Sequence, residues 1–244
     1  MGCEKESGDT CGSDPSSIKE RTREKYDVQW KGQSERAAAE RRKALSSVAD
    51  PLLSLVAPLE GKVVVDLGIG TGSLAFRALE LGNPKHLVGI DFSLPGLRVA
   101  RSISDHTAFK DKEVDLIRAD LERIPLANKV ADVIISQATV NLLPDKNAAM
   151  REIARIAKAG AKVAISDGFR TSKCASSDED WAQCVGGTVT VQEFSSLALT
   201  AGLVVVNQTD LTQQVRALIK AKKWDWPEFI QNNLDYRVFL MLRG

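Results

Sequence analysis

Residues 63–72 read VVVDLGIGTG, and this stretch decides how the rest of the chain is interpreted. An apolar run rich in valine ends at Asp66, and three glycines follow at alternate positions: Gly68, Gly70 and Gly72. The run has the length and β-branched content of a buried strand, and residues 73–81 have the apolar spacing of a helix. Glycines at such a turn permit positive φ and let a ligand approach the backbone closely. The stretch therefore predicts a strand, a ligand-binding turn and a helix.

A second acidic residue supports a nucleotide-like ligand at this turn. Asp91 ends the apolar run HLVGID, 19 residues after Gly72, which is about where nucleotide-binding folds place an acid on the ribose hydroxyls. A carboxylate before the glycines, Asp66, would repel a pyrophosphate but suits an ammonium or sulfonium group. The GxxxxGK[ST] pattern of a P-loop is absent from the sequence. The alternative is a tight turn in an α/β protein that binds no ligand.

Strand-like and helix-like segments alternate from Lys62 onward, which predicts a doubly wound α/β fold with a mostly parallel sheet. Five strands are expected at 62–66, 86–91, 114–120, 131–136 and 162–166, and helices at 94–103 and 147–157. Near the end, a helix closing at Gly202 precedes two paired strands at the sheet edge, 203–208 and 236–243. Ligands in such sheets lie beyond the carboxyl ends of the strands. The site candidates are therefore the polar residues closing the strands: Asp66, Asp91, Asp120, Ser136 and Asp167.

The chain divides into three parts by composition. Residues 1–17 are polar and are expected to be disordered. Residues 18–58 are charged and alanine-rich, and predict helices that cap the domain with a solvated basic face. Residues 59–244 form the α/β domain.

Bulk properties narrow the classes of partner. The net charge of +1 gives no electrostatic case for a nucleic-acid or membrane partner, and no apolar run is long enough to span a bilayer. Four irregularly spaced cysteines do not form a disulfide framework, so we expect a cytoplasmic protein. The two histidines, His86 and His106, lie in unrelated segments and predict no zinc cluster.

The acid followed by GxGxG resembles motif I of the class I S-adenosylmethionine-dependent methyltransferases, whose fold is a seven-stranded Rossmann-like sheet with an antiparallel C-terminal edge. The resemblance implies that the methionine part of the cofactor lies at the glycine loop, with the ribose at Asp91 and the adenine at Asp120. The implied cofactor residues are Asp66, Gly68, Ile69, Gly70, Gly72, Asp91, Phe92, Asp120, Leu121 and Gln137. Two alternatives stay open: Asp120 caps the next helical turn, and Ile69 belongs to the core. No general base is evident, and methyl transfer depends mainly on positioning.

The segments VNLLPDK (140–146) and CVGG (184–187) resemble the arsenite methyltransferase family, as do REKYD near Tyr26 and the final YRVFLML. This resemblance implies a role in arsenic detoxification, in which Cys184 ligates trivalent arsenic and glutathione or thioredoxin acts as reductant. Thiolates suit this soft acceptor and leave its lone pair free to attack the methyl group.

The chain departs from that family at one position. Where the family carries its second cysteine ligand, this chain has Ala138. Cys174 is a candidate for the second sulfur, and Arg170 and Lys173 would favour its thiolate. The alternative is that Cys174 is an incidental thiol and Cys184 a small buried hydrophobe.

Three functions follow. The first is methylation of arsenite or a related soft species, with Cys184 and Cys174 as catalytic ligands. The second is O-, N- or C-methylation of another small molecule, and the third is non-catalytic binding of the cofactor or a metalloid. The sequence leaves open the number of methyl groups added, the role of Cys3 and Cys11, and the oligomeric state.

Overall fold

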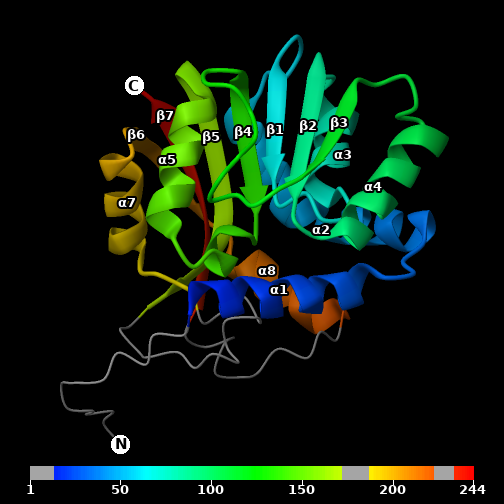
Figure 1. Ribbon diagram of the computed structural model, residues 1–244, viewed down its shortest axis with the longest axis horizontal. Coiled ribbons are helices and arrows are strands. Elements are labelled where there is room, and N and C mark those ends of the chain that lie inside the picture. The colour runs from blue at the N-terminus through cyan, green and yellow to red at the C-terminus, as the bar shows by residue number, and fades with distance from the viewer. Residues whose placement is uncertain (1–13, 172–186, 223–233) are drawn as a thin grey trace, which may run out of the picture.

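The computed structural model describes residues 14–171, 187–222 and 234–244. The strands of its sheet are β1 (Val63–Leu67), β2 (His86–Asp91), β3 (Val114–Arg118), β4 (Ala131–Gln137), β5 (Ala157–Arg170), β6 (Leu203–Asp210) and β7 (Leu234–Arg243). They form one seven-stranded sheet in the order β3-β2-β1-β4-β5-β7-β6 (Figure 1). The first five strands in sequence are parallel, whereas β7 runs antiparallel to both β5 and β6. The predicted fold class, including the antiparallel C-terminal edge, is confirmed.

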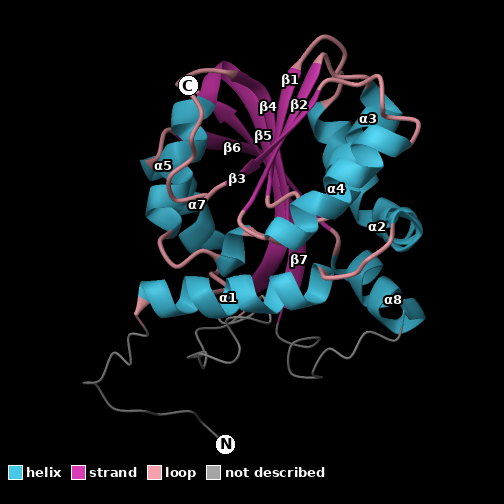
Figure 2. Ribbon diagram, turned by 45° about the vertical axis from the view of Figure 1, so that its right-hand side comes forward, coloured by secondary structure: helices cyan, strands magenta, loops and turns pink. Residues whose placement is uncertain are grey.

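Helices cover both faces of the sheet and the carboxyl ends of its parallel strands. They are α1 (Pro15–Trp30), α2 (Glu35–Val56), α3 (Ser73–Gly82), α4 (Leu94–His106), the short 3-10 helix η1 (Val140–Leu142), α5 (Lys146–Ile156), α7 (Val191–Thr200) and α8 (Thr212–Lys222). In Figure 2, α5 and α7 lie on one side of the sheet, and α2, α3 and α4 lie on the other. Helix α1 crosses beneath both layers. No helix in the described ranges is long and apolar enough to cross a membrane.

The alternating side chains of β1 explain why the sheet is buried on both faces. Val65 and Leu67 join the cluster that packs under α5 and α7, whereas Val64 points to the cluster under α2 and α3. Residues on a strand alternate between faces, so a continuous valine run feeds both cores. At the C-terminal side, Phe194 of α7 and Phe239 of β7 lie with ring centroids 4.8 Å apart. These contacts fix the antiparallel edge to the parallel part of the sheet.

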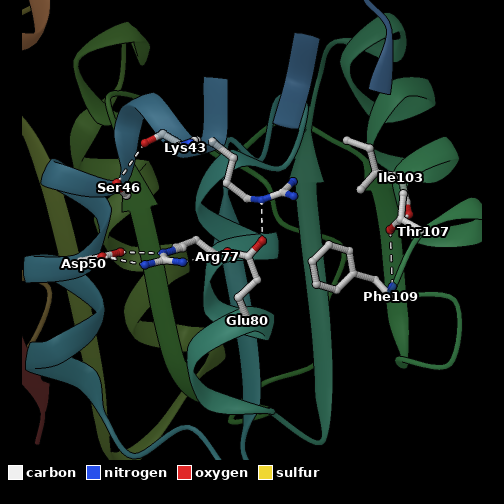
Figure 3. Close-up of polar contacts among 9 residues, drawn as sticks. Lys43, Ser46, Asp50, Arg77, Glu80, Ile103, Thr107 and Phe109 are labelled. Carbon is white, nitrogen blue, oxygen red and sulfur yellow. Dashed lines mark hydrogen bonds and ion pairs between the residues drawn. The ribbon is translucent and has the colours of Figure 1, made fainter. Parts of the chain in front are cut away.

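Helices α2 and α3 are joined by a charged network on their outer surface. The Arg77 guanidinium donates from Nε and Nη2 to the two oxygens of Asp50, at 2.7 and 2.8 Å, and from Nη1 to Glu80 at 2.9 Å (Figure 3). Arg42 of α2 donates to the other oxygen of Glu80 at 2.8 Å. Bidentate arginine–carboxylate pairs are stronger and more directional than single ion pairs. The network therefore holds α2 against the helix that follows the glycine loop.

Several boundaries differ from those predicted. Helix α1 begins at Pro15 rather than at Ile18, because Asp14 accepts a hydrogen bond from the Ser16 amide at 3.3 Å and proline is tolerated in the first turn. Strand β5 begins at Ala157, earlier than the expected residue 162. Helix α8 was not predicted; it packs against α2 and β7.

Candidate functional site

The site lies at the topological switch point of the sheet. Strands β1 and β4 are neighbours, but β1 continues the order toward β2 and β3 while β4 continues it toward β5. Loops after adjacent strands therefore diverge there and leave a crevice. A cavity of about 1000 Å³ fills this crevice between the strand ends and α1. Its volume is at the upper end of the range for small-molecule sites.

The glycine loop after β1 forms the floor of the cavity. Gly68, Gly70 and Gly72 all have positive φ, between 52° and 87°. Gly68 also lies against the Thr139 side chain, which occupies the space that a Cβ on Gly68 would need. Gly70 faces the indole of Trp30, 3.6 Å from where its own Cβ would be. The loop is therefore enclosed between the segment after β4 and helix α1.

Asp66 is the most unusual ionisable group in the site. Its side chain is buried, and its Oδ2 has no hydrogen-bond partner among the described residues. Burial raises the pKa of this carboxyl to about 8, the nearby charge of Asp91 adds to the rise, and a hydrogen bond from the Ala75 backbone opposes it. Buried polar atoms are almost always paired. An unpaired oxygen on a residue that lines a cavity therefore points to a ligand with a hydrogen-bond donor or positive charge.

Asp91, at the end of β2, is held rigidly. Its Oδ2 accepts from the Gly70 amide and its Oδ1 from the Ser93 amide, both at 2.8 Å. The Ser93 hydroxyl in turn donates to Asp27 of α1 at 2.7 Å. Burial raises the pKa of Asp91, although these amide hydrogen bonds oppose the rise. Asp91 thus ties the glycine loop to its own strand while its carboxylate still lines the cavity.

Asp120 lies at the rim rather than inside. Its Oδ1 accepts from the Glu122 amide at 2.9 Å, which is the local capping bond considered from the sequence. Its Oδ2 pairs with Lys19 of α1 at 2.6 Å, and Lys19 also pairs with Glu122. Asp120 and the buried Leu121 both line the cavity. The capping role is therefore present in the structure, and α1 closes over the same carboxylate.

The structure brings the remaining predicted cofactor residues to the same cavity, and one of them also belongs to the hydrophobic core. Ile69, Phe92 and Gln137 all line the cavity. Ile69 is 4% exposed and belongs to the core cluster with α3 and α4, which confirms its core position, while its contact with the cofactor stays a prediction. The lining residues that were not identified from the sequence as parts of the site include Lys19, Trp30 and Thr139. Each comes from an element distant in sequence from the glycine loop.

Two candidates from the strand ends turn away from the cavity. The Ser136 hydroxyl donates to the Leu67 carbonyl at 2.9 Å and is fully buried. Asp167 is buried as well, and its carboxylate accepts two hydrogen bonds from Asn141, one from the backbone amide and one from the side-chain amide. The prediction that both line the ligand site is wrong, because β4 and β5 point these side chains into the protein.

Part of the cavity lining is apolar. Leu45, Val48, Leu142, Leu218, Ile219 and Tyr236 line the cavity there. Ala138, at the position where a cysteine was expected from the family pattern, also lines it and has φ of 55°. Cys184 and Cys174, together with Cys3 and Cys11, lie outside the described residues. Within the ranges described, no cluster of three His, Cys, Asp or Glu side chains could hold a metal ion.

Known proteins agree with this architecture. Residues 58–238 match the sequence profile described as "Methyltransferase domain". An arsenite methyltransferase of Aquipseudomonas alcaligenes is 33% identical over 160 residues, which cover 61% of this chain and 46% of that protein. An O-methyltransferase of Pyrenophora dematioidea is 25% identical over 171 residues, covering 68% of this chain and 63% of that protein. The chain spans about half the length of the arsenite methyltransferases that it matches.

A solved geranyl diphosphate methyltransferase in complex with S-adenosylmethionine has the same fold. It superposes with a TM-score of 0.73 at 15% identity, over 88% of this chain and 92% of that one. The matched sequence profile covers well over half of the chain. The protein therefore belongs to the methyltransferase domain family.

Proposed function

We propose that this methyltransferase binds its cofactor across the glycine loop and transfers the methyl group to a trivalent arsenical or a related soft acceptor held by thiolates. The unpaired Oδ2 of buried Asp66 carries the cofactor part of the proposal. S-adenosylmethionine supplies an electrophilic methyl group on a sulfonium, and it also carries an ammonium group. A buried carboxylate without a partner suits such a cation, because opposite charges attract strongly where water is excluded.

The other predicted residues complete the cofactor site. Asp91 presents a rigid carboxylate to the ribose hydroxyls, since its two amide partners fix its orientation. Leu121 and Phe92 offer apolar surface to the adenine, and Asp120 lies at the rim above it. Gln137 and Ile69 line the region between the glycine loop and β4. Helix α1 excludes water from the opposite side through Tyr26 and Trp30.

Two observations support an arsenical acceptor. Several curated relatives at 26–33% identity are arsenite methyltransferases, and the VNLLPDK and CVGG segments resemble that family. Cys184 and Cys174 would hold the metalloid, and a thiol such as glutathione or thioredoxin would regenerate them. A cytoplasmic location and a role in arsenic detoxification belong to the same proposal.

A second candidate is favoured by the lining of the cavity. Among the described residues, the cavity lining after β4 has Ala138 where a thiolate was expected, and Leu142, Leu143 and Pro144 of the same segment are apolar. A small apolar organic molecule would fit this surface, with an oxygen, nitrogen or carbon atom as the methyl acceptor. The curated O-methyltransferase relative is consistent with such chemistry. The acceptor assay below separates the two candidates.

Replacing Asp66 should raise the stability of the cofactor-free protein and weaken cofactor binding. The folded-state pKa of Asp66 is about 8 against a reference value of 3.8, so the folded chain holds a proton that the unfolded chain loses. Stability of the cofactor-free wild type therefore falls as the pH rises from about 4 to about 8, by up to about 1.4 kcal/mol per pH unit. Asp66→Asn has no such slope. We expect the variant to gain melting temperature relative to wild type at pH 8 more than at pH 5, and to lose S-adenosylhomocysteine binding in calorimetry. Unchanged binding affinity would contradict the assignment.

Removing the α1 ion pairs should speed release of the cofactor product. Lys19→Met keeps an apolar side chain of similar length at this position but removes the ion pairs with Asp120 and Glu122. Because α1 is then held less firmly over the cavity, we expect S-adenosylhomocysteine to dissociate about 3–10-fold faster in stopped-flow fluorescence. The control is Arg36→Met on α2, since Arg36 is 89% exposed and pairs only with its helical neighbour Glu40 among the described residues. An unchanged rate in Lys19→Met would rule out α1 as the closing element.

The acceptor is tested by incubating wild type, Cys184→Ser and Ala138→Cys with arsenite, glutathione and methyl-labelled cofactor. The arsenical proposal predicts methylated arsenic from wild type, at least about 100-fold less from Cys184→Ser, and arsenite binding about tenfold tighter in Ala138→Cys, because a further thiolate then lines the cavity. Wild type that binds S-adenosylhomocysteine but neither methylates nor binds arsenite would contradict the arsenical. Labelling of apolar phenols or amines by the same preparation would then support the organic acceptor.

A further inference from the structure

Gly187 lies against residues that stand far from it in the sequence. Gly187 ends the CVGG segment, and Asn141 and Lys146 belong to VNLLPDK. The backbone of Gly187 lies so close to Asn141 that a Cβ on Gly187 would overlap the Asn141 carbonyl oxygen, and it would lie 3.1 Å from Lys146 Nζ. Only glycine fits there without displacing its neighbours. Gly187 is thus packed directly against residues 141–146.

Asn141 is joined to β5 by a set of buried hydrogen bonds. Its side-chain amide donates to Asp167 Oδ1 at 2.8 Å and to the Gly168 carbonyl at 2.6 Å, and its backbone amide donates to Asp167 Oδ2 at 3.1 Å. Asp167 Oδ1 also accepts from the Gly168 amide at 2.9 Å. Both Asn141 and Asp167 are 2% exposed. A fully bonded polar network inside a protein specifies one arrangement of the elements that it connects.

Lys146 supplies the positive charge of this network. It is 8% exposed, and its Nζ donates to the carbonyls of Leu143 at 2.8 Å and Asn141 at 3.5 Å. Burial lowers its pKa to about 8, while the charges of Asp167 and Glu122 oppose that shift and Arg170 adds to it. A lysine is costly to bury unless it is paired. Its position at the start of α5 thus ties η1 to the following helix and compensates Asp167.

The segment held by these three residues forms one wall of the cavity. Ala138, Thr139, Leu142, Leu143 and Pro144 all line it. Ala138 has φ of 55°, a conformation that costs about 1–2 kcal/mol for a residue with a Cβ and persists only where the surroundings impose it. The next residue, Thr139, lies directly against Gly68 of the glycine loop. A shift of this wall would therefore change its distance from the glycine loop.

We propose that Asn141, Lys146 and Asp167 act as a positioning unit, which holds the wall of residues 138–144 against the glycine loop and so determines where the acceptor lies relative to the cofactor. The inference rests on the proposed function, because the wall has a catalytic meaning only if an acceptor binds beside it. None of the three residues lines the cavity in its described part, so they act through the wall rather than on the substrate.

The test compares Lys146→Met and Gly187→Ala with wild type, all saturated with S-adenosylhomocysteine. Lys146→Met removes the donor, and Gly187→Ala pushes on Asn141 from the other side. In both, hydrogen exchange measured by mass spectrometry should be about tenfold faster or more in peptides spanning 138–144, with the 66–74 loop unchanged. With an active acceptor, kcat should fall about 10–100-fold while the dissociation constant of S-adenosylhomocysteine stays within about twofold.

Lys158→Met is the matched control, because Lys158 pairs with Asp132 at 2.7 Å at the opposite end of β4; it should leave every readout unchanged. Unaltered exchange of 138–144 in Lys146→Met would overturn the proposal. So would a loss of S-adenosylhomocysteine affinity by the same factor as kcat, since that pattern indicates general damage. If wild type binds S-adenosylhomocysteine but methylates no acceptor, the proposed function fails, and the exchange data still decide whether the three residues hold the wall.

Discussion

The structure depends most on a buried carboxylate, Asp66, at the point where the strand order of the sheet reverses between β1 and β4. The valine strand that precedes it must be buried on both faces, so the strand carries Asp66 into the interior with one oxygen unpaired. The glycines that follow let the chain turn away at once, beside the cavity that Asp66 helps to line. Protonation relieves the cost of burial in the absence of a ligand, which is why the pKa of Asp66 rises to about 8. A bound cation would stabilise the ionised Asp66 carboxylate in place of that proton.

Around this acid the protein closes the site from three directions. Asp91 fixes the glycine loop from β2, Thr139 contacts it from the segment after β4, and Trp30 covers it from α1. Lys19 reaches Asp120 and Glu122, and Glu122 also accepts a hydrogen bond from the Asp145 amide at the start of α5 at 2.8 Å. Helix α1 and the start of α5 therefore share one carboxylate, that of Glu122. Enclosure by packed elements keeps water out and fixes orientation, which is most of what methyl transfer requires.

Local patterns predicted the strands, the turn and both acids, because side-chain periodicity and turn chemistry act over a few residues. Contacts between distant segments were not predictable in this way: Lys19 pairs with Asp120 across 101 positions, and nothing in the local charge pattern distinguishes it from a solvated lysine. Of the polar residues at the strand ends, Asp66 and Asp91 line the cavity, whereas Asp167 does not. Beyond the switch point, on β5, the side chain of Asp167 is satisfied by Asn141 inside the protein. The arsenic ligands stay a prediction, since Cys184 and Cys174 lie outside the described residues.

The central claim is that Asp66 exchanges a proton for the cationic group of the cofactor. The most direct test is calorimetric titration of wild type with S-adenosylhomocysteine at pH 6.5 in buffers of different ionisation enthalpy, which counts protons released on binding. With a pKa of about 8 in the free protein, Asp66 is protonated at that pH. The account predicts release of about one proton per molecule bound, because the bound ammonium stabilises the carboxylate. Binding with no net proton release would contradict it.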